Sequence, residues 1–77
     1  MTRVQIVKAL EEIGDEMAVP ALLRLLETTD SSVVRYTTIA ALGVLGDEEI
    51  VPRIEVYATD PDHHVRERVD MALRKLR

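Results

Sequence analysis

Two adjacent histidines, His63 and His64, are the residues that most suggest metal or acid–base chemistry, and Asp60 and Asp62 stand just before them. Neighbouring residues of a helix point about 100° apart, so two such rings cannot easily chelate one ion. The sequence specifies no third or fourth ligand. We therefore interpret the pair as polar residues of a first helical turn, with a contact role open for His64, and expect neither a metal nor a cofactor.

Other catalytic constellations are missing from these 77 residues. The chain has no cysteine nucleophile and no glycine-rich phosphate loop, and its two serines, Ser31 and Ser32, suit helix capping. The acidic run from Asp47 to Glu49 suits the positive end of a helix. We therefore predict that the protein is not an enzyme.

Charge and composition bear on partners and location. A net charge of −4 disfavours a general attraction to nucleic acid. The basic residues near the C-terminus are interleaved with Glu67 and Asp70 and lack aromatic neighbours for base stacking. The apolar run within residues 1–10 is too short for a membrane span. We expect a cytoplasmic protein with a protein partner, and the shortage of thermolabile residues suggests a thermophilic source.

An internal repeat supplies the elements that must position these residues. Shifting the chain by 32 positions aligns nine identical residues, among them Gly14 with Gly46 and Pro20 with Pro52. A third, partial copy follows, in which Arg66 repeats Arg35. A fixed period of this size indicates stacked units of two helices each. We predict an all-α chain, a short α-solenoid in one domain over residues 1–77, with half a repeat at 3–13 and repeats at 15–45 and 47–76.

Five helices follow from this pattern, at residues 3–13, 17–28, 32–45, 48–59 and 62–76. Gly46 lies where a left-handed residue often ends a helix, and Asp60-Pro61 resembles a cap followed by a first-turn proline. Pro20 and Pro52 lie about one turn inside their helices. We expect each proline to cause a shallow bend or a late helix start.

The helices differ in how their apolar residues are distributed. The second helix is nearly all apolar from Met17 to Leu26, which predicts that it is covered on more than one side and lies at the centre of the stack. The last helix has a single apolar stripe, which suits a terminal cap. The first helix has a wide apolar surface with no predicted cover. Either a longer array continues there, or a homo-oligomer or another protein covers it.

Two segments, VVRYTTIAALGVLGDEEIVPRI and HVRERVDMALRKL, resemble the short HEAT-like repeats of the phycobilin-lyase type. The resemblance covers nearly the whole chain. It implies that an Asp and an Arg bond between successive units, and the matching positions are Asp30 and Asp62 with Arg35 and Arg66. Metal-dependent hydroxylases of HEAT-like build carry paired His-Glu motifs, and this sequence contains no His-Glu.

The resemblance also implies that the second helix of each unit lines a concave surface. The predicted partner-binding residues are Lys8, Glu12, Val33, Tyr36, Thr37, Ala40, Val44, His64, Arg68 and Met71. Tyr36 lies in an apolar strip flanked by charged helices, as expected of a contact anchor, although it could instead pack over a neighbouring helix. We predict a non-enzymatic protein–protein interaction scaffold, with a subunit of a bilin-chromophore lyase-like assembly as the alternative.

Replacement of Ala41 by leucine tests the predicted close approach of the helices. Small residues at positions 40 and 41 let adjacent helices pack closely, so the added volume should destabilise the fold by about 1–3 kcal/mol through overpacking. Thermal unfolding measures this, and a melting curve within error of the parent would contradict the predicted packing.

Overall fold

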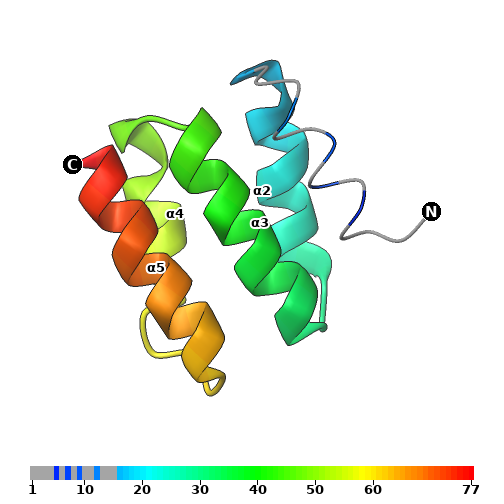
Figure 1. Cartoon of the computed structure of the whole chain (residues 1–77), viewed down its shortest axis with the longest axis vertical. Coiled ribbons are helices and arrows are strands. Elements are labelled where there is room, and N and C mark those ends of the chain that lie inside the picture. Colours follow the sequence, from blue (N-terminus) through cyan, green and yellow to red (C-terminus); the bar gives the residue numbers. More distant parts are fainter. Residues whose placement is uncertain (1–4, 6, 8, 10–11, 13–15) are drawn as a thin grey trace.

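The computed structural model describes residues 5, 7, 9, 12 and 16–77 (Figure 1). Within this part the chain is helical and contains no strand, in the order η1 (Glu16–Ala18), α2 (Val19–Thr28), α3 (Ser32–Leu45), η2 (Glu48–Ile50), α4 (Val51–Glu55) and α5 (His63–Leu76). The all-α class is therefore confirmed. Four predicted helices have α-helical counterparts. Most of the predicted helix over 3–13, and the predicted association through it, lie outside the described residues, so a count of five is not confirmed.

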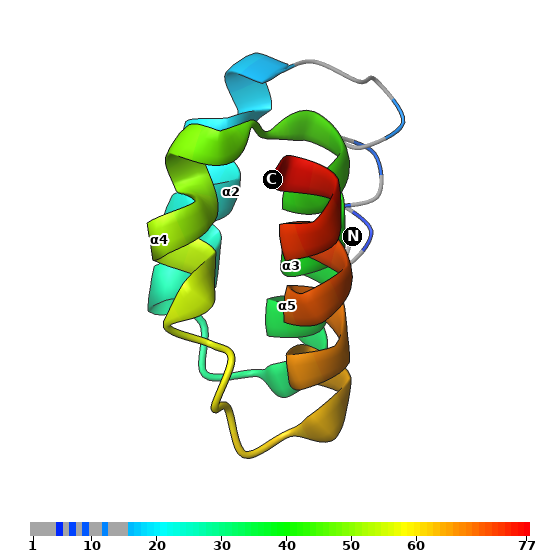
Figure 2. The same ribbon diagram turned by 90° about the vertical axis from the view of Figure 1, so that its left-hand side faces the viewer.

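The helices form two layers. Helices α2 and α4 make one layer, and α3 and α5 make the other (Figure 2). Helices α3 and α5 run side by side in the same direction (Figure 1). Apolar side chains from both layers fill the core, and the largest that are fully buried are Val7, Leu22, Leu26, Ile39, Leu42, Ile54, Val65 and Val69. This arrangement is compatible with a short α-solenoid.

Helix α3, and not α2, is the central helix of the described part. It packs against both α2 and α5, and it buries side chains along most of its length. Helix α2 buries Leu22, Leu23 and Leu26 but exposes Pro20, Ala21 and Arg24. The prediction that the second helix lies at the centre was therefore wrong. Alanine and proline count as apolar residues in a sequence pattern, yet both can also lie on the solvent-exposed side of a helix, as Ala21 and Pro20 do here.

The two prolines lie at late helix starts, which is one of the two outcomes predicted for them from the sequence. Pro20 and Pro52 lie in the first turns of α2 and α4, and a short 3-10 helix precedes each of these helices. A first-turn proline loses no helical hydrogen bond, because its N–H would have no partner within the helix. The predicted helix over 48–59 is consequently divided into η2, α4 and the turn residues that follow.

Side-chain caps begin α3 and α5. The hydroxyl of Ser31 accepts a hydrogen bond of 3.3 Å from the amide of Val34. The carboxylate of Asp62 accepts bonds of 2.8 Å and 3.3 Å from the amides of His64 and Val65. Asp62 is therefore the cap of α5, and the predicted cap-and-proline role of Asp60-Pro61 was wrong because the helix begins only at His63.

Helix α5 has the one-sided character expected of a terminal cap. Val65, Val69, Ala72 and Leu76 are buried, and most of its remaining residues are exposed. Among the described residues, no helix is long and apolar enough to cross a membrane.

Gly46 ends α3 without a left-handed backbone. Its φ is −86° and its ψ is −175°, which is extended backbone open to any residue, so the predicted conformation was wrong. A lack of space for a side chain explains why this residue is a glycine. A Cβ at this position would lie 2.8 Å from the carbonyl oxygen of Leu42 and would collide with the side chain of Ile50.

A Gly46→Ala substitution should therefore destabilise the protein by about 1–3 kcal/mol, because the added methyl group forces Ile50 and the end of α3 apart. Chemical denaturation measures the effect. Val44→Ala serves as the control, since Val44 is 53% exposed and its truncation should change stability by no more than about 0.5 kcal/mol. Equal stability of the Gly46→Ala variant and the parent would show that the space is not needed.

Candidate functional site

A shallow groove runs between α3 and α5. It has a volume of about 140 Å³ and is lined by Ala40, Gly43, Val44, Arg68, Met71, Ala72 and Lys75; we call it the α3–α5 groove. Its floor follows from small residues on both helices. A Cβ on Gly43 would lie only 3.1 Å from the Cβ of Ala72, so the two helices pack nearly backbone to backbone there.

The rim of the α3–α5 groove combines apolar and cationic side chains. Val44 and Met71 are 53% and 47% exposed. Arg68 and Lys75 are exposed on α5, and a guanidinium nitrogen of Arg68 lies 3.9 Å from the sulfur of Met71. Within the part of the chain that the structure describes, no carboxylate forms an ion pair with Arg68 or Lys75.

Aromatic rings lie one helical turn before this groove on both helices. The ring centroids of Tyr36 and His64 are 5.5 Å apart, and those of His63 and His64 are 4.0 Å apart. Tyr36 is half-buried and packs against the hydrophobic core. It therefore does pack over a neighbouring helix, and its role as a partner anchor stays a prediction.

The structure brings most of the predicted contact residues onto one face. Tyr36, Ala40 and Val44 on α3 lie beside His64, Arg68 and Met71 on α5. Val33 is exposed and Thr37 is half-buried, both on α3. Glu12 is helical and exposed but does not line the groove, and Lys8 lies outside the described residues.

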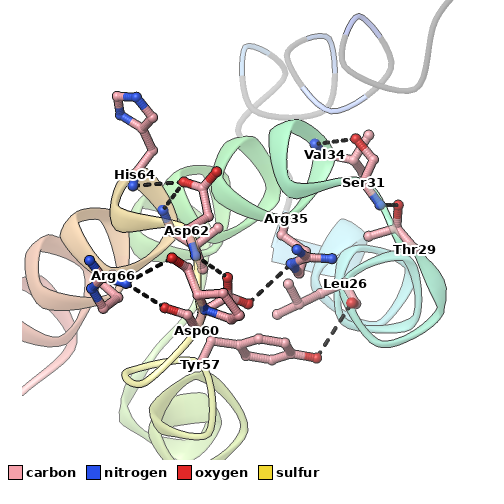
Figure 3. Close-up of polar contacts among 12 residues, drawn as sticks. Leu26, Thr29, Ser31, Val34, Arg35, Tyr57, Asp60, Asp62, His64 and Arg66 are labelled. Atoms are coloured by element: carbon pink, nitrogen blue, oxygen red, sulfur yellow. Dashed lines mark hydrogen bonds and ion pairs between the residues drawn. The ribbon is translucent and has the colours of Figure 1, made fainter.

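A largely buried ion pair joins successive helix pairs on the other side of α3 (Figure 3). The Nε of Arg35 lies 3.2 Å from a carboxylate oxygen of Asp60, and the side chains are 19% and 9% exposed. The geometry is that of an ion pair and not of a hydrogen bond. Arg35 thus anchors the connection between α4 and α5 to α3.

The partners in this junction differ from the predicted ones. Arg66 donates hydrogen bonds of 2.7 Å and 3.0 Å to the carbonyl oxygens of Asp60 and Pro61, and Asp62 caps α5. Asp30 is exposed. The repeat alignment placed Asp30 opposite Asp62, but three residues connect α2 to α3 whereas seven connect α4 to α5. The longer connection presents Asp60, and not its aligned neighbour, to Arg35.

Tyr57 completes the junction and was not identified from the sequence. Its hydroxyl donates a hydrogen bond of 3.4 Å to the carbonyl oxygen of Leu26 in α2 (Figure 3). Burial raises the pKa of Tyr57, and the nearby carboxylate of Glu27 raises it further. The ring therefore stays neutral and ties the α4–α5 connection to the first helix pair.

A second groove carries the opposite charge. It has a volume of about 380 Å³ and is lined by Glu16, Val19, Pro20, Leu45, Gly46, Asp47, Glu49 and Ile50; we call it the carboxylate groove. Of the described residues that line it, three are acidic and none is basic. The sequence pattern placed Asp47 in an acidic run at the positive end of a helix, and its carboxylate accepts a 2.9 Å hydrogen bond from the amide of Glu49. The sequence could not show that Glu16 lies at the same groove.

The described residues do not fit a metal centre. They contain no group of three or more His, Asp or Glu side chains placed to hold one ion. The rings of His63 and His64 lie against each other, and His64 also contacts Tyr36.

Comparisons with known proteins identify the repeat. The family model of the PBS lyase HEAT-like repeat matches residues 2–28, which confirms the resemblance predicted from the sequence pattern. Deoxyhypusine hydroxylases from Bos taurus, Gallus gallus and Homo sapiens are 37%, 35% and 34% identical to it over 68 residues. The match covers 87% of this chain but only 22–23% of each relative. No solved structure matches the chain.

These relatives are enzymes, and they overturn the predictions of a non-enzymatic scaffold and of a chain that is not an enzyme. The bilin-lyase alternative is not retained either. The error has a physical origin. The prediction treated missing catalytic motifs as evidence against an enzyme, but a segment that spans less than a quarter of an enzyme need not contain its reacting groups.

The cap at Asp62 gives a prediction of pH dependence. Burial alone would raise the pKa of this carboxyl group, but bonds from the amides of His64 and Val65, a bond from Ser32 and the charge of His64 lower it below its usual 3.8. A lowered pKa means that the carboxylate stabilises the fold above pH 3.8 and loses this effect as the pH falls through the lowered value.

An Asp62→Ala variant should therefore be less stable than the parent at neutral pH, and the difference should shrink in strong acid. Urea denaturation of both proteins over a pH series measures it. A difference that stays constant down to the acid limit would contradict a role for the ionised carboxylate.

Proposed function

We propose that this chain forms part of a hydroxylase that acts on deoxyhypusine, a lysine-derived side chain bearing amino groups. The observation that carries the proposal is the 68-residue similarity to deoxyhypusine hydroxylases, which takes in 87% of the chain. The chain spans less than a quarter of those enzymes, so we propose a contribution to the activity and not the whole of it. We place this activity in the cytoplasm.

The contribution that suits this chain is to hold the substrate. Its described residues do not fit a metal centre, so we assign no step of oxygen activation to them. The α3–α5 groove and the carboxylate groove are two places where a substrate could bind, and they differ in charge.

The carboxylate groove is the better match for an amine-bearing side chain. Its three acidic residues, Glu16, Asp47 and Glu49, favour an ammonium group through charge-assisted hydrogen bonds. Apolar residues of the same groove, such as Val19 and Leu45, suit the methylene groups of a long amine, as they do for lysine stems. The α3–α5 groove carries Arg68 and Lys75 instead and would repel the amine.

This assignment predicts a preference for the modified side chain. Two fluorescent peptides that are identical except for lysine or deoxyhypusine at one position should bind with different affinity, the deoxyhypusine form more tightly, because it brings an additional amine to the carboxylates. Fluorescence anisotropy with the full chain measures both. The double variant Glu16→Gln/Glu49→Gln should weaken binding of the deoxyhypusine peptide by about two- to fivefold, as expected for exposed charge pairs.

Glu67→Gln is the control, since it removes one exposed carboxylate, against two in the double variant, and lies on α5, outside the carboxylate groove. It should leave the affinity unchanged. Equal affinity of the two peptides for the parent, or an equal loss of affinity in the control variant, would count against the proposed substrate site.

A further inference from the structure

We propose that the α3–α5 groove binds an acidic peptide segment, with carboxylates on Arg68 and Lys75 and an apolar side chain between Val44 and Met71. This inference concerns a different groove from the proposed amine site and does not rest on the hydroxylase assignment.

The distribution of ion pairs supports an acidic occupant. Arg35, Arg53, Arg74 and Arg77 each pair with a carboxylate of the chain itself, namely Asp60, Glu27, Asp70 and Glu55. Arg68 and Lys75 lie on the same helix as Arg74, yet neither forms an ion pair with any residue that the structure describes. On a chain whose net charge is −4, these two side chains leave positive charge at the edge of a groove. A carboxylate-bearing partner would complement it.

The spacing of the two cations suits a peptide. Arg68 and Lys75 are seven residues apart on α5, which is about two helical turns or roughly 10 Å along one side of the groove. A partner must therefore carry two acidic groups separated by a few residues. Side chains two or four positions apart on an extended segment point to the same face and are about 7 Å or 13 Å apart, at about 3.3 Å per residue, which brackets this length.

The apolar residues between the cations indicate what lies between those carboxylates. Val44 and Met71 are about half exposed, and the small residues Ala40, Gly43 and Ala72 line the remainder of the groove. The volume of about 140 Å³ is well below the roughly 300–1,000 Å³ of sites that enclose small molecules. It suits one aliphatic side chain of a peptide, and methionine adapts readily to such partners.

A peptide is a better match than the two other occupants that the charge alone would permit. Single-stranded nucleic acid favours grooves lined with aromatic rings on which bases stack, and the described residues that line this groove include none, since Tyr36 and His64 lie one helical turn outside it. A second copy of this chain would bring its own net charge of −4, which opposes close association.

Fluorescence anisotropy with the full chain tests the proposal. The probe is a labelled peptide with one leucine between two acidic pairs, and the comparison peptides replace either the acidic residues by lysine or the leucine by serine. We expect the acidic leucine peptide to bind and both comparison peptides to bind at least about fivefold more weakly. Its affinity should fall as the salt concentration rises.

Variants locate the binding. Arg68→Gln/Lys75→Gln should weaken binding of the acidic peptide by about fivefold, whereas Arg74→Gln, which removes an exposed cation already paired with Asp70, should leave it unchanged. Met71→Ser should also weaken it, and Val56→Ser is the control, because Val56 is 69% exposed but lies outside the groove. All these positions are exposed, and circular dichroism verifies that each variant folds.

Three results would overturn the proposal. The first is equal binding of the acidic and lysine peptides, and the second is competition by a DNA duplex as strong as that by the acidic peptide. The third is self-association in sedimentation experiments that Arg68→Gln/Lys75→Gln abolishes, because a second copy would then be the occupant.

Discussion

The close contact between α3 and α5 is the constraint on which the rest of this structure depends. Gly43 and Ala72 leave so little space that a single Cβ on the glycine would press against the facing alanine. Because these helices approach so closely, α3 can bury side chains against α5 on one side and α2 on the other. The same contact gives the α3–α5 groove its shallow floor. Larger residues at these two positions would both push α3 and α5 apart and fill the groove.

The Arg35–Asp60 ion pair is a second constraint, and it acts on the connection between α4 and α5. A largely buried pair gains little net stability, since both charges lose solvation. Its geometric effect is clearer. Together with the bonds from Arg66 to the carbonyl oxygens of Asp60 and Pro61, it holds the seven-residue connection against α3, and Tyr57 joins that connection to α2. These contacts hold the connection that leads into α5, whose first turn is capped by Asp62.

Two grooves of opposite charge meet at the end of α3. Val44 lines the α3–α5 groove and its neighbour Leu45 lines the carboxylate groove. Adjacent residues of a helix point in different directions, so one short segment serves two surfaces. Gly46 then allows the chain to turn tightly into η2, which carries Glu49 of the carboxylate groove.

The sequence by itself determined the helical class, the repeat and most helix boundaries, because glycines, prolines, caps and apolar spacing are local signals. The range predicted for α3 agrees with the structure, and the prolines at positions 20 and 52 mark late helix starts as one outcome anticipated. Part of the predicted contact face could also be predicted from the sequence, because equivalent positions of parallel helices lie side by side.

Only the tertiary structure determined which described helix is central and which carboxylate pairs with Arg35. It also determined that Glu16 lines the same groove as Asp47 and Glu49. Each depends on residues far apart in the chain. An apolar count does not say which side of a helix meets solvent, and a repeat alignment assumes that aligned helices end at aligned positions. Helix α4 ends at Glu55, whereas the end of α2 at Thr28 aligns with Asp60. The carboxylate that reaches Arg35 is therefore set by the path of the chain in space and not by its place in the repeat.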